Sequence, residues 1–426
     1  MRVGDNFCPG ILHAVPAKDG LLLRIRVPGG LIRSSQLRAL AELSAKLSDG
    51  QIEITSRANI QLRAIKSRDL DMAVEHLTSV NLLPSREHDR VRNIIASPLT
   101  GLDSAELLDT RPLVHALDER ITADSALLEL HPKFSVALDG GGRWFSRETD
   151  DLAMRAVEIE GVPYFHLSIG GLPTGKGVTI DQAVDCIFDT ARACLRIARQ
   201  FDLPVRGRRI AAVPDAISCL MEFLSGVSVP CPTPKDFKVE VEWPVGVIPT
   251  RQTGLVSVIP SIPLGRLQAA QAKSISDIAE DCDASLRLAP WHGIVLGGIR
   301  ERSANSVIAK LQADGMSLDA NDGYQGLSTC AGIDGCEASL ADVRADAHSL
   351  ARQLAGMDRK PGWTANISGC EKQCAMRNGA TADLVATESG YRMKLYGISD
   401  DSLHSSVSAL DAALACHASF TGEVCS

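Results

Sequence analysis

Four of the twelve cysteines form two pairs in the C-terminal quarter of the chain, at spacings that suit metal ligation. Cys330 and Cys336 enclose five residues, and Cys370 and Cys374 enclose three. The glycines beside them allow tight turns that bring backbone N–H groups close to sulfur. A cubane iron–sulfur cluster needs four converging thiolates, and such N–H groups tune its potential. The pattern therefore predicts a [4Fe–4S] cluster on these four cysteines.

Two other interpretations of the paired cysteines stay open on spacing alone. Structural zinc usually takes ligand pairs with two to four intervening residues, and the first pair here is looser than that. Free cysteine is also a common small buried side chain, which is our expectation for most of the eight scattered cysteines. A disulfide framework is not expected in a chain with cytoplasmic features.

The composition excludes several classes of protein. A net charge of −8, from 44 Lys and Arg against 52 Asp and Glu, disfavours a nucleic-acid-binding protein. Aromatic residues make up only 4% of the chain, too few for a base-stacking platform. No apolar run of about eighteen residues predicts a membrane helix, and the first residues lack the apolar segment of a signal peptide. We therefore expect a cytoplasmic protein with neither nucleic-acid nor membrane partners.

Three basic residues stand where predicted strands begin or end. Arg57 follows a strand pattern at residues 52–55, Arg92 opens the stretch 93–99, and Lys133 precedes an apolar strand. Arginine forks bind carboxylates through two parallel hydrogen bonds, so several converging forks suit a polycarboxylate ligand. For each residue taken alone, a solvated surface charge is the alternative.

The chain also repeats itself, with an offset of 234 residues. The strand patterns at 20–26 and 52–55 return at 254–260 and 286–289. Between the first two patterns, leucines at helical spacing predict one amphipathic helix. Only the second copy carries the paired cysteines, and a duplicated fold of this kind usually places a ligand between its halves. The two copies span roughly residues 8–230 and 248–426, and the helical leucines are Leu37, Leu40, Leu43 and Leu47.

The duplication, the two cysteine pairs and the segment Thr55-Ser56-Arg57 together resemble the sulfite/nitrite reductase superfamily over nearly the whole chain. Within it, the precorrin-3B synthases of aerobic cobalamin biosynthesis are the more similar group. That similarity lies in Cys8-Pro9-Gly10 and in the segments 55–62, 93–99 and 287–291.

The resemblance implies an α+β fold, in which two pseudo-twofold-related halves form three subdomains. One subdomain is shared by the first parts of the repeats, and each second part forms one of its own. The implied ranges are a first ferredoxin-like half-domain at 8–85, a first reductase-like domain at 90–230, a second half-domain at 248–320, and a second reductase-like domain with the iron–sulfur site at 321–426.

The resemblance also implies a reaction, the O₂-dependent hydroxylation of precorrin-3A at C20 with lactone formation. The implied cofactors are a [4Fe–4S] cluster and a non-haem iron, and the tetrapyrrole polycarboxylate substrate would take the place of sirohaem. An external donor, a reductase or a ferredoxin, would supply the electrons, since no flavin or nicotinamide motif is visible. Neither the ligands of the second iron nor a catalytic residue can be named.

The resemblance assigns Arg57, Arg92 and Lys133 to the carboxylates of the macrocycle. One position departs from the reductases, which carry a second lysine two residues after the first, where this chain has Ser135. That lysine helps to bind the sulfur oxyanion, so its loss weakens the reductase interpretation. The alternatives are a sirohaem-dependent assimilatory sulfite or nitrite reductase, and a non-catalytic tetrapyrrole-binding or electron-transfer protein that keeps the cluster.

Overall fold

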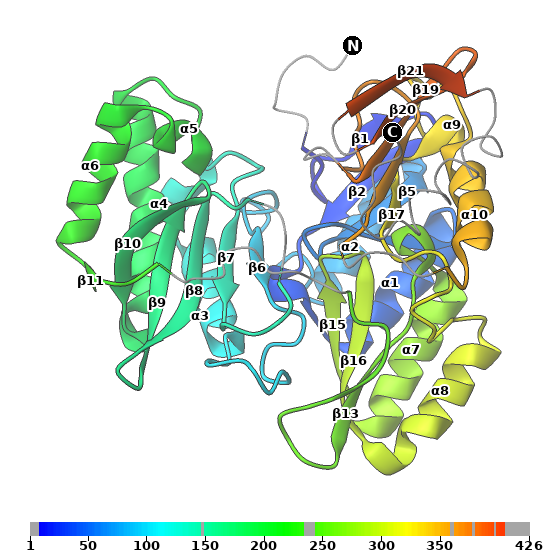
Figure 1. Cartoon of the computed structure of the whole chain (residues 1–426), viewed down its shortest axis with the longest axis horizontal. Coiled ribbons are helices and arrows are strands. Elements are labelled where there is room, and N and C mark those ends of the chain that lie inside the picture. Colours follow the sequence, from blue (N-terminus) through cyan, green and yellow to red (C-terminus); the bar gives the residue numbers. More distant parts are fainter. Residues whose placement is uncertain are drawn as a thin grey trace, which may run out of the picture.

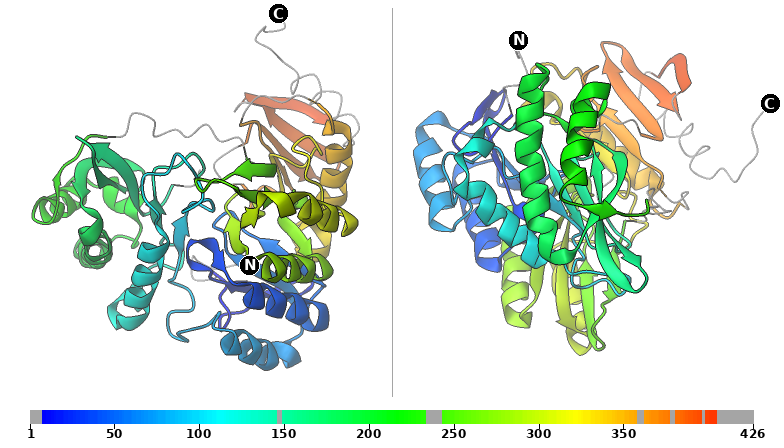
Figure 2. Two further views of the ribbon diagram at one scale, coloured as in Figure 1. Left: turned by 90° about the horizontal axis from the view of Figure 1, so that it is seen from below. Right: turned by 90° about the vertical axis from the view of Figure 1, so that its left-hand side faces the viewer.

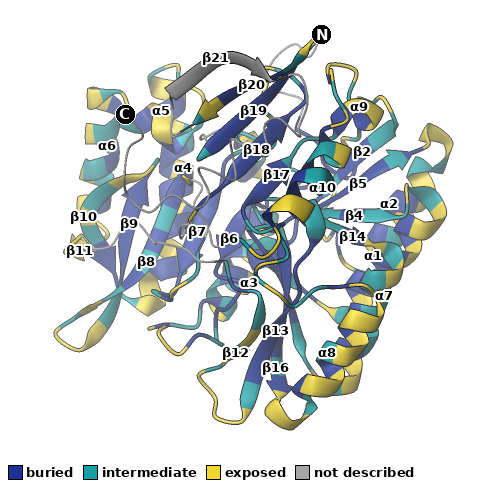
Figure 3. Cartoon of the chain, turned by 45° about the vertical axis from the view of Figure 1, so that its right-hand side comes forward, coloured by how far each residue is buried: buried dark blue, intermediate teal, exposed yellow. Residues whose placement is uncertain are grey.

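A computed structural model of the chain describes residues 8–145, 149–233, 243–357, 362–376, 380–395 and 398–404. Within these ranges four β-sheets and their helices form three main hydrophobic cores. None of the described helices is long and apolar enough to cross a membrane. Figure 3 shows the burial pattern behind this layout, with buried residues in the strands and exposed residues along the outer faces of the helices.

The first parts of the two copies build two five-stranded sheets that exchange a strand. The sheet orders are β1-β2-β5-β4-β14 and β12-β13-β16-β15-β3, so each sheet receives its last strand from the other copy. The first sheet comprises β1 (Val15–Ala17), β2 (Gly20–Ile25), β5 (Ile60–Ile65), β4 (Gln51–Ile54) and β14 (Arg266–Gln268). The second comprises β12 (Gly246–Pro249), β13 (Leu255–Ile259), β16 (Gly293–Arg300), β15 (Ser285–Ala289) and β3 (Leu31–Ile32).

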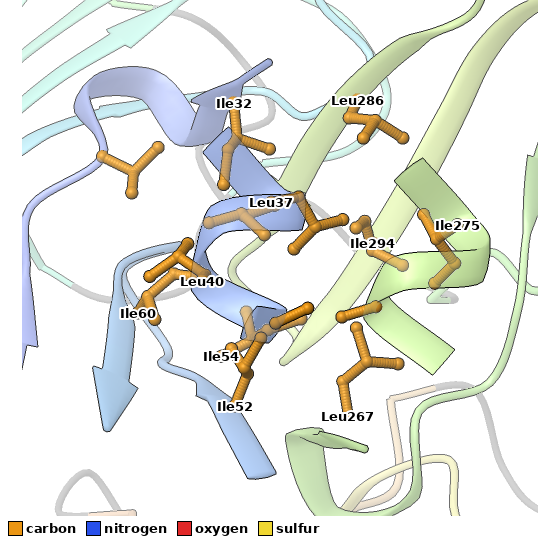
Figure 4. Packing of buried hydrophobic residues seen from close by; sticks show 14 of the residues in the cluster. Ile32, Leu37, Leu40, Ile52, Ile54, Ile60, Leu267, Ile275, Leu286 and Ile294 are labelled. Atoms are coloured by element: carbon orange, nitrogen blue, oxygen red, sulfur yellow. The ribbon is translucent and has the colours of Figure 1, made fainter. Parts of the chain in front are cut away.

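One core unites these two sheets. The predicted amphipathic helix is α1 (Ser34–Leu47), which packs against α7 (Ala269–Cys282) of the second copy. Leu37, Leu40 and Leu43 of α1 are buried, as helical spacing predicted. Figure 4 shows side chains of both copies in this one cluster. Two further helices, α2 (Leu70–Ser79) and α8 (Ala304–Ala313), belong to the same subdomain.

The second part of the first copy forms a lobe at one side of the molecule (Figures 1 and 2). Its six-stranded sheet has the order β11-β10-β9-β8-β7-β6 and has its own core. The strands are β6 (Ile94–Ala96), β7 (Val136–Asp139), β8 (Leu152–Ile159), β9 (Val162–Ile169), β10 (Leu172–Val178) and β11 (Val229–Pro230). The helices are α3 (Arg111–Ala123), α4 (Ala183–Gln200), α5 (Gly207–Ala211) and α6 (Pro214–Ser225).

The second part of the second copy repeats this topology around a third core. Its sheet has the order β17-β18-β19-β20-β21. In both lobes three parallel strands are followed by an antiparallel one. The elements are β17 (Leu327–Thr329), α9 (Gly332–Gly335), α10 (Val343–Leu354), β18 (Ala365–Ser368), β19 (Ala382–Thr387), β20 (Gly390–Leu395) and β21 (Ile398–His404).

The predicted duplicated α+β fold is therefore confirmed, with one correction to its offset. Leu62 and Leu296 are 234 residues apart, but their strand partners are Leu23 and Val258, which are 235 apart. The offset of 234 thus fails in β2 and β13. The offset of 235 continues through α1 and α7 and becomes 234 at β4 and β15, so the copies differ by one residue in the turn after these helices.

Candidate functional site

The two cysteine pairs leave the same edge of one parallel sheet. Thr329 of β17 pairs with Ile367 of β18, and Cys330 directly follows β17. Cys370 comes two residues after β18 ends. Because the carboxyl ends of parallel strands meet at one edge, both loops start side by side. The backbone N–H of Gly369 donates to the sulfur of Cys330 at 3.3 Å, which joins one loop to the other.

Close packing between these loops depends on glycine. The N–H of Leu340 donates to the carbonyl of Gly369 at 2.8 Å, and a Cβ added to Gly369 would lie 1.9 Å from the hydroxyl of Ser339. Cys336 caps the short helix α9 by donating its N–H to the carbonyl of Gly332 at 3.0 Å. Gly332 has a φ of +72°, a backbone conformation that residues other than glycine rarely adopt.

The four thiols of the two loops could hold a cubane cluster. The ten described cysteines are all free, and Cys330, Cys336 and Cys370 are half-buried while Cys374 is exposed. Among the described residues no three His, Cys, Asp or Glu side chains converge closely enough to hold one metal ion. A sulfur that accepts a backbone N–H fits the cluster. No group of ligands for the second iron is present among the described residues either.

The first copy contains the same loop without its cysteines. Leu107 donates its N–H to Gly140 at 2.9 Å, as Leu340 does to Gly369. The strand registers and this hydrogen bond show which residues of the two loops correspond. Thiol chemistry is thus confined to one lobe, although both lobes share the backbone that would carry it. The counterparts of Cys330, Cys336 and Cys370 are Ser97, Asp103 and Gly141.

Buried carboxylates occupy this cysteine-free loop. Asp103 pairs with Arg143 at 3.1 Å, and Asp139 pairs with Arg155. Burial raises the pKa of Asp139 to about 6, although Arg155 opposes the shift. Burial likewise raises the pKa of Glu106 to about 7, against hydrogen bonds from Thr100 and from the N–H of Gly101. The ion pair of Asp103 with Arg143 therefore stands where the second copy has the thiol of Cys336.

The raised pKa of Glu106 makes a testable contribution to stability. Between about pH 4.5 and pH 7 the folded protein keeps a proton on Glu106. The unfolded chain, in which the pKa of this carboxyl group is near 4.5, releases that proton. The free energy of unfolding should therefore fall as pH rises from about 4.5 to 7, by on the order of 3 kcal/mol from this group. Glu106→Gln keeps an acceptor for Gly101 and removes that dependence. Urea denaturation at pH 5 and pH 8 should show a smaller difference in the variant.

The matched control is Glu129→Gln, since the Glu129 side chain is 61% exposed. Its pH dependence should equal that of the unmodified protein. Equal pH dependence in all three proteins would show that Glu106 titrates in the folded state as it does in the unfolded chain.

Arg57 lies in the loop between β4 and β5 beside two arginines that spacing did not single out. Arg24 lies in β2 and Arg26 directly follows it, and Arg26 is only 3% exposed. Burial lowers the pKa of Arg26 to about 9, and the neighbouring cations Arg24 and Arg57 lower it further, against Asp89 and Cys8. Within the described residues, Nε and Nη1 of Arg26 have no hydrogen-bond partner, and Nη2 reaches Pro9 O at 3.4 Å. The spacing of two residues at the end of the strand pattern was the signal that could have identified both arginines.

The other two predicted basic residues have different surroundings. Arg92 is buried, and its guanidinium makes two hydrogen bonds, of 2.7 and 2.6 Å, to the carboxylate of Asp118 on α3. Lys133 is half-buried just before β7, and its N–H donates to the ring of His131. Arg92 thus has a structural partner, and the structure does not bring it together with Arg26 in any described contact. A substrate-binding role for Arg92 or Lys133 stays a prediction.

Ser135, which stands where the reductases have a second lysine, is fully buried. Its N–H donates to the carboxylate of Asp151 at 3.0 Å, and its carbonyl accepts from the N–H groups of Asp151 and Leu152. Its hydroxyl has no hydrogen-bond partner among the described residues. The serine is therefore part of the packing at the start of β7 and presents no cation to a ligand.

Two family models match the chain. The nitrite/sulfite reductase ferredoxin-like half domain matches residues 13–80 and 248–314, which are the two strand-exchanging units. The nitrite and sulphite reductase 4Fe-4S domain matches residues 87–200, which is the lobe of the first copy. The cysteines within the matched residues are Cys186 and Cys194, and both are buried on α4. This match therefore supports a cluster in the family without locating it in this chain.

Characterised relatives cover most of the chain. A ferredoxin–nitrite reductase of Synechococcus elongatus is 28% identical over 407 residues, covering 89% of this chain and 78% of the relative. A precorrin-3B synthase of Sinorhizobium is 25% identical over 393 residues, covering 92% and 82%. The solved structure of the Mycobacterium tuberculosis NirA protein has a TM-score of 0.74 at 20% identity, covering 93% of this chain and 79% of that one. This last similarity concerns the fold.

Proposed function

The chain belongs to the nitrite/sulfite reductase superfamily of oxidoreductases, and on that premise we propose that it is a precorrin-3B synthase. The proposed reaction is a monooxygenation in which one atom of O₂ reaches C20 of precorrin-3A. The other oxygen atom leaves as water, with two electrons and two protons, and a ring acetate closes the lactone. The electrons come from an external reductase or ferredoxin.

The observation that carries the proposed substrate class is the buried Arg26 beside the half-buried Arg24 and Arg57. A cation with unpartnered N–H groups at 3% exposure is unfavourable in the fold by itself. A carboxylate that accepts those N–H groups would offset this cost and would form charge-assisted hydrogen bonds. A tetrapyrrole with many acidic side chains supplies such carboxylates, so these arginines would bind and orient the macrocycle.

The observation that favours the synthase over a sulfite reductase is the burial of Ser135. An oxyanion ligand needs a nearby cation, and this hydroxyl is enclosed at the start of β7. A site that hydroxylates a macrocycle does not need that cation. When bound by Cys330, Cys336, Cys370 and Cys374, a [4Fe–4S] cluster would supply single electrons. The glycines between the loops hold the thiols in place, and the N–H of Gly369 would stabilise charge on the sulfur of Cys330.

A sirohaem-dependent nitrite reductase is the second candidate function. It is favoured by the ferredoxin–nitrite reductases among the relatives, such as the Zea mays protein, which is 28% identical over 402 residues. Both candidates use a cluster and a polycarboxylate tetrapyrrole. They differ in whether that tetrapyrrole is a resident cofactor with iron or a metal-free substrate.

Anaerobic purification followed by pigment extraction with acid and acetone separates the two. For the synthase we expect four sulfides per chain, more than four irons, and no extractable sirohaem. The purified protein should then consume O₂ in the presence of precorrin-3A and a reductant. Extractable sirohaem together with nitrite-dependent oxidation of reduced ferredoxin would contradict the synthase and support the reductase.

A further inference from the structure

Two cations of the first copy reach across to the cysteine loop of the second. Lys18 donates from Nζ to the carbonyl of Ile333 at 2.8 Å. Arg63 of β5 donates from Nη2 to the carbonyl of Gly335 at 2.6 Å, one residue before Cys336. The Arg63 side chain is only 6% exposed, and two hydrogen bonds of 2.8 and 3.0 Å fix it to Asp19. The loop that bears Cys336 is therefore held by the sheet that also carries Arg24, and Arg26 directly follows a strand of that sheet.

The duplication provides an internal control for the role of Arg63. Leu102 of the first copy stands at the place of Gly335. Gly297, in β16 of the second copy, stands at the place of Arg63. These two pack directly, since a Cβ on Gly297 would lie 2.4 Å from a methyl carbon of Leu102. The same loop thus folds against its sheet without a cation. Arg63 is present only where the loop carries thiols, so folding alone does not account for it.

Further arginines surround the same junction. Arg266 of β14 pairs with Glu53 of β4 at 2.7 Å, and Arg344 of α10 approaches the same carboxylate at 3.6 Å. Arg266 is close enough to both Arg344 and Arg63 for their charges to interact. Glu53 and Asp19 pair with these arginines among the described contacts, and Asp49 is close enough for its charge to act on Arg63 and Arg266. The junction therefore places three arginines and their carboxylate partners beside the loop.

We propose that Arg63 is a positioning residue that holds Cys336 in place and raises the reduction potential of the cluster. The proposal rests on the cluster assigned above, and it goes further by naming what tunes it. Four thiolates give a [4Fe–4S] centre a negative total charge, which increases on reduction. A buried cation nearby stabilises the reduced state more than the oxidised one, and hydrogen bonds and net charge are among the protein's means of setting such potentials.

Substitutions of opposite sign test this role. Arg63→Gln keeps a donor for Gly335 and removes the charge, so the midpoint potential should shift to a lower value. Asp19→Asn removes the counter-charge of Arg63, so the potential should shift to a higher value. Arg63→Lys should stay closer to the unmodified protein. The measurement is a reductive titration of the purified protein followed by electron paramagnetic resonance, with iron and sulfide content determined for each variant.

The control is Arg68→Gln, because the Arg68 side chain is 77% exposed. The midpoint potential of the cluster should not change in this variant. If Arg63→Gln does not fold or does not hold the cluster, Asp19→Asn still decides the question. Unchanged potentials in Asp19→Asn and in every Arg63 variant that keeps its cluster would overturn the proposal. Absence of any cluster from the unmodified protein would instead overturn the proposed function, so the two failures are distinguishable.

Discussion

Cys330→Ser should abolish the bound iron and sulfide, and with them the broad visible absorption of the protein. Cys330 begins one loop, and its sulfur already accepts the N–H of Gly369 from the other, so it stands at the junction of both pairs. A serine hydroxyl is a much poorer ligand, because it does not ionise near neutral pH as a thiol bound to metal does. Iron and sulfide analysis of anaerobically purified protein checks this result.

The matched control is Cys219→Ser. Cys219 is half-buried on α6, in the lobe of the first copy, and takes no part in the two loops. This variant should keep its full iron and sulfide content and its colour. If Cys330→Ser also kept a complete cluster, or if both variants lost it equally, the assignment of the four ligands would be wrong.

Arg26→Met should weaken tetrapyrrole binding and, at the same time, stabilise the ligand-free protein. Loss of a charge-assisted hydrogen bond should reduce affinity by about tenfold to a hundredfold. Replacing a buried, poorly paired cation by an apolar side chain of similar length should raise the free energy of unfolding by about 1–4 kcal/mol. Fluorescence titration with uroporphyrin, which carries eight carboxylates, measures the first effect, and urea denaturation measures the second.

The opposite signs of these two effects are what identify a binding role. A residue needed only for the fold would lower stability when replaced, and Arg68→Met, on the exposed surface, should change neither quantity. Unchanged uroporphyrin affinity in Arg26→Met would remove Arg26 from the site. A loss of stability would instead show that the contact of Arg26 with the carbonyl of Pro9 serves the fold.

The local patterns of the sequence predicted the elements of the fold well. Strand alternation and helical leucine spacing are set by which face of an element is buried, and that information is contained in a few consecutive residues. The duplication was visible for the same reason, because both copies bury equivalent positions such as Leu62 and Leu296. The exchange of β3 and β14 between the sheets was not visible, because strand partners are chosen by tertiary packing.

The sequence by itself determined the chemistry available to this protein: four thiols in two glycine-flanked pairs, present in one copy only. Only the tertiary structure decided which charges accompany them. The guanidinium of Arg92, a residue that spacing predicts for the ligand, is bound to Asp118, and Arg26 and Arg63 are buried beside groups distant in the sequence. The physical reason is that the state of a charge depends on its burial and on partners brought close by folding, and residue spacing encodes neither.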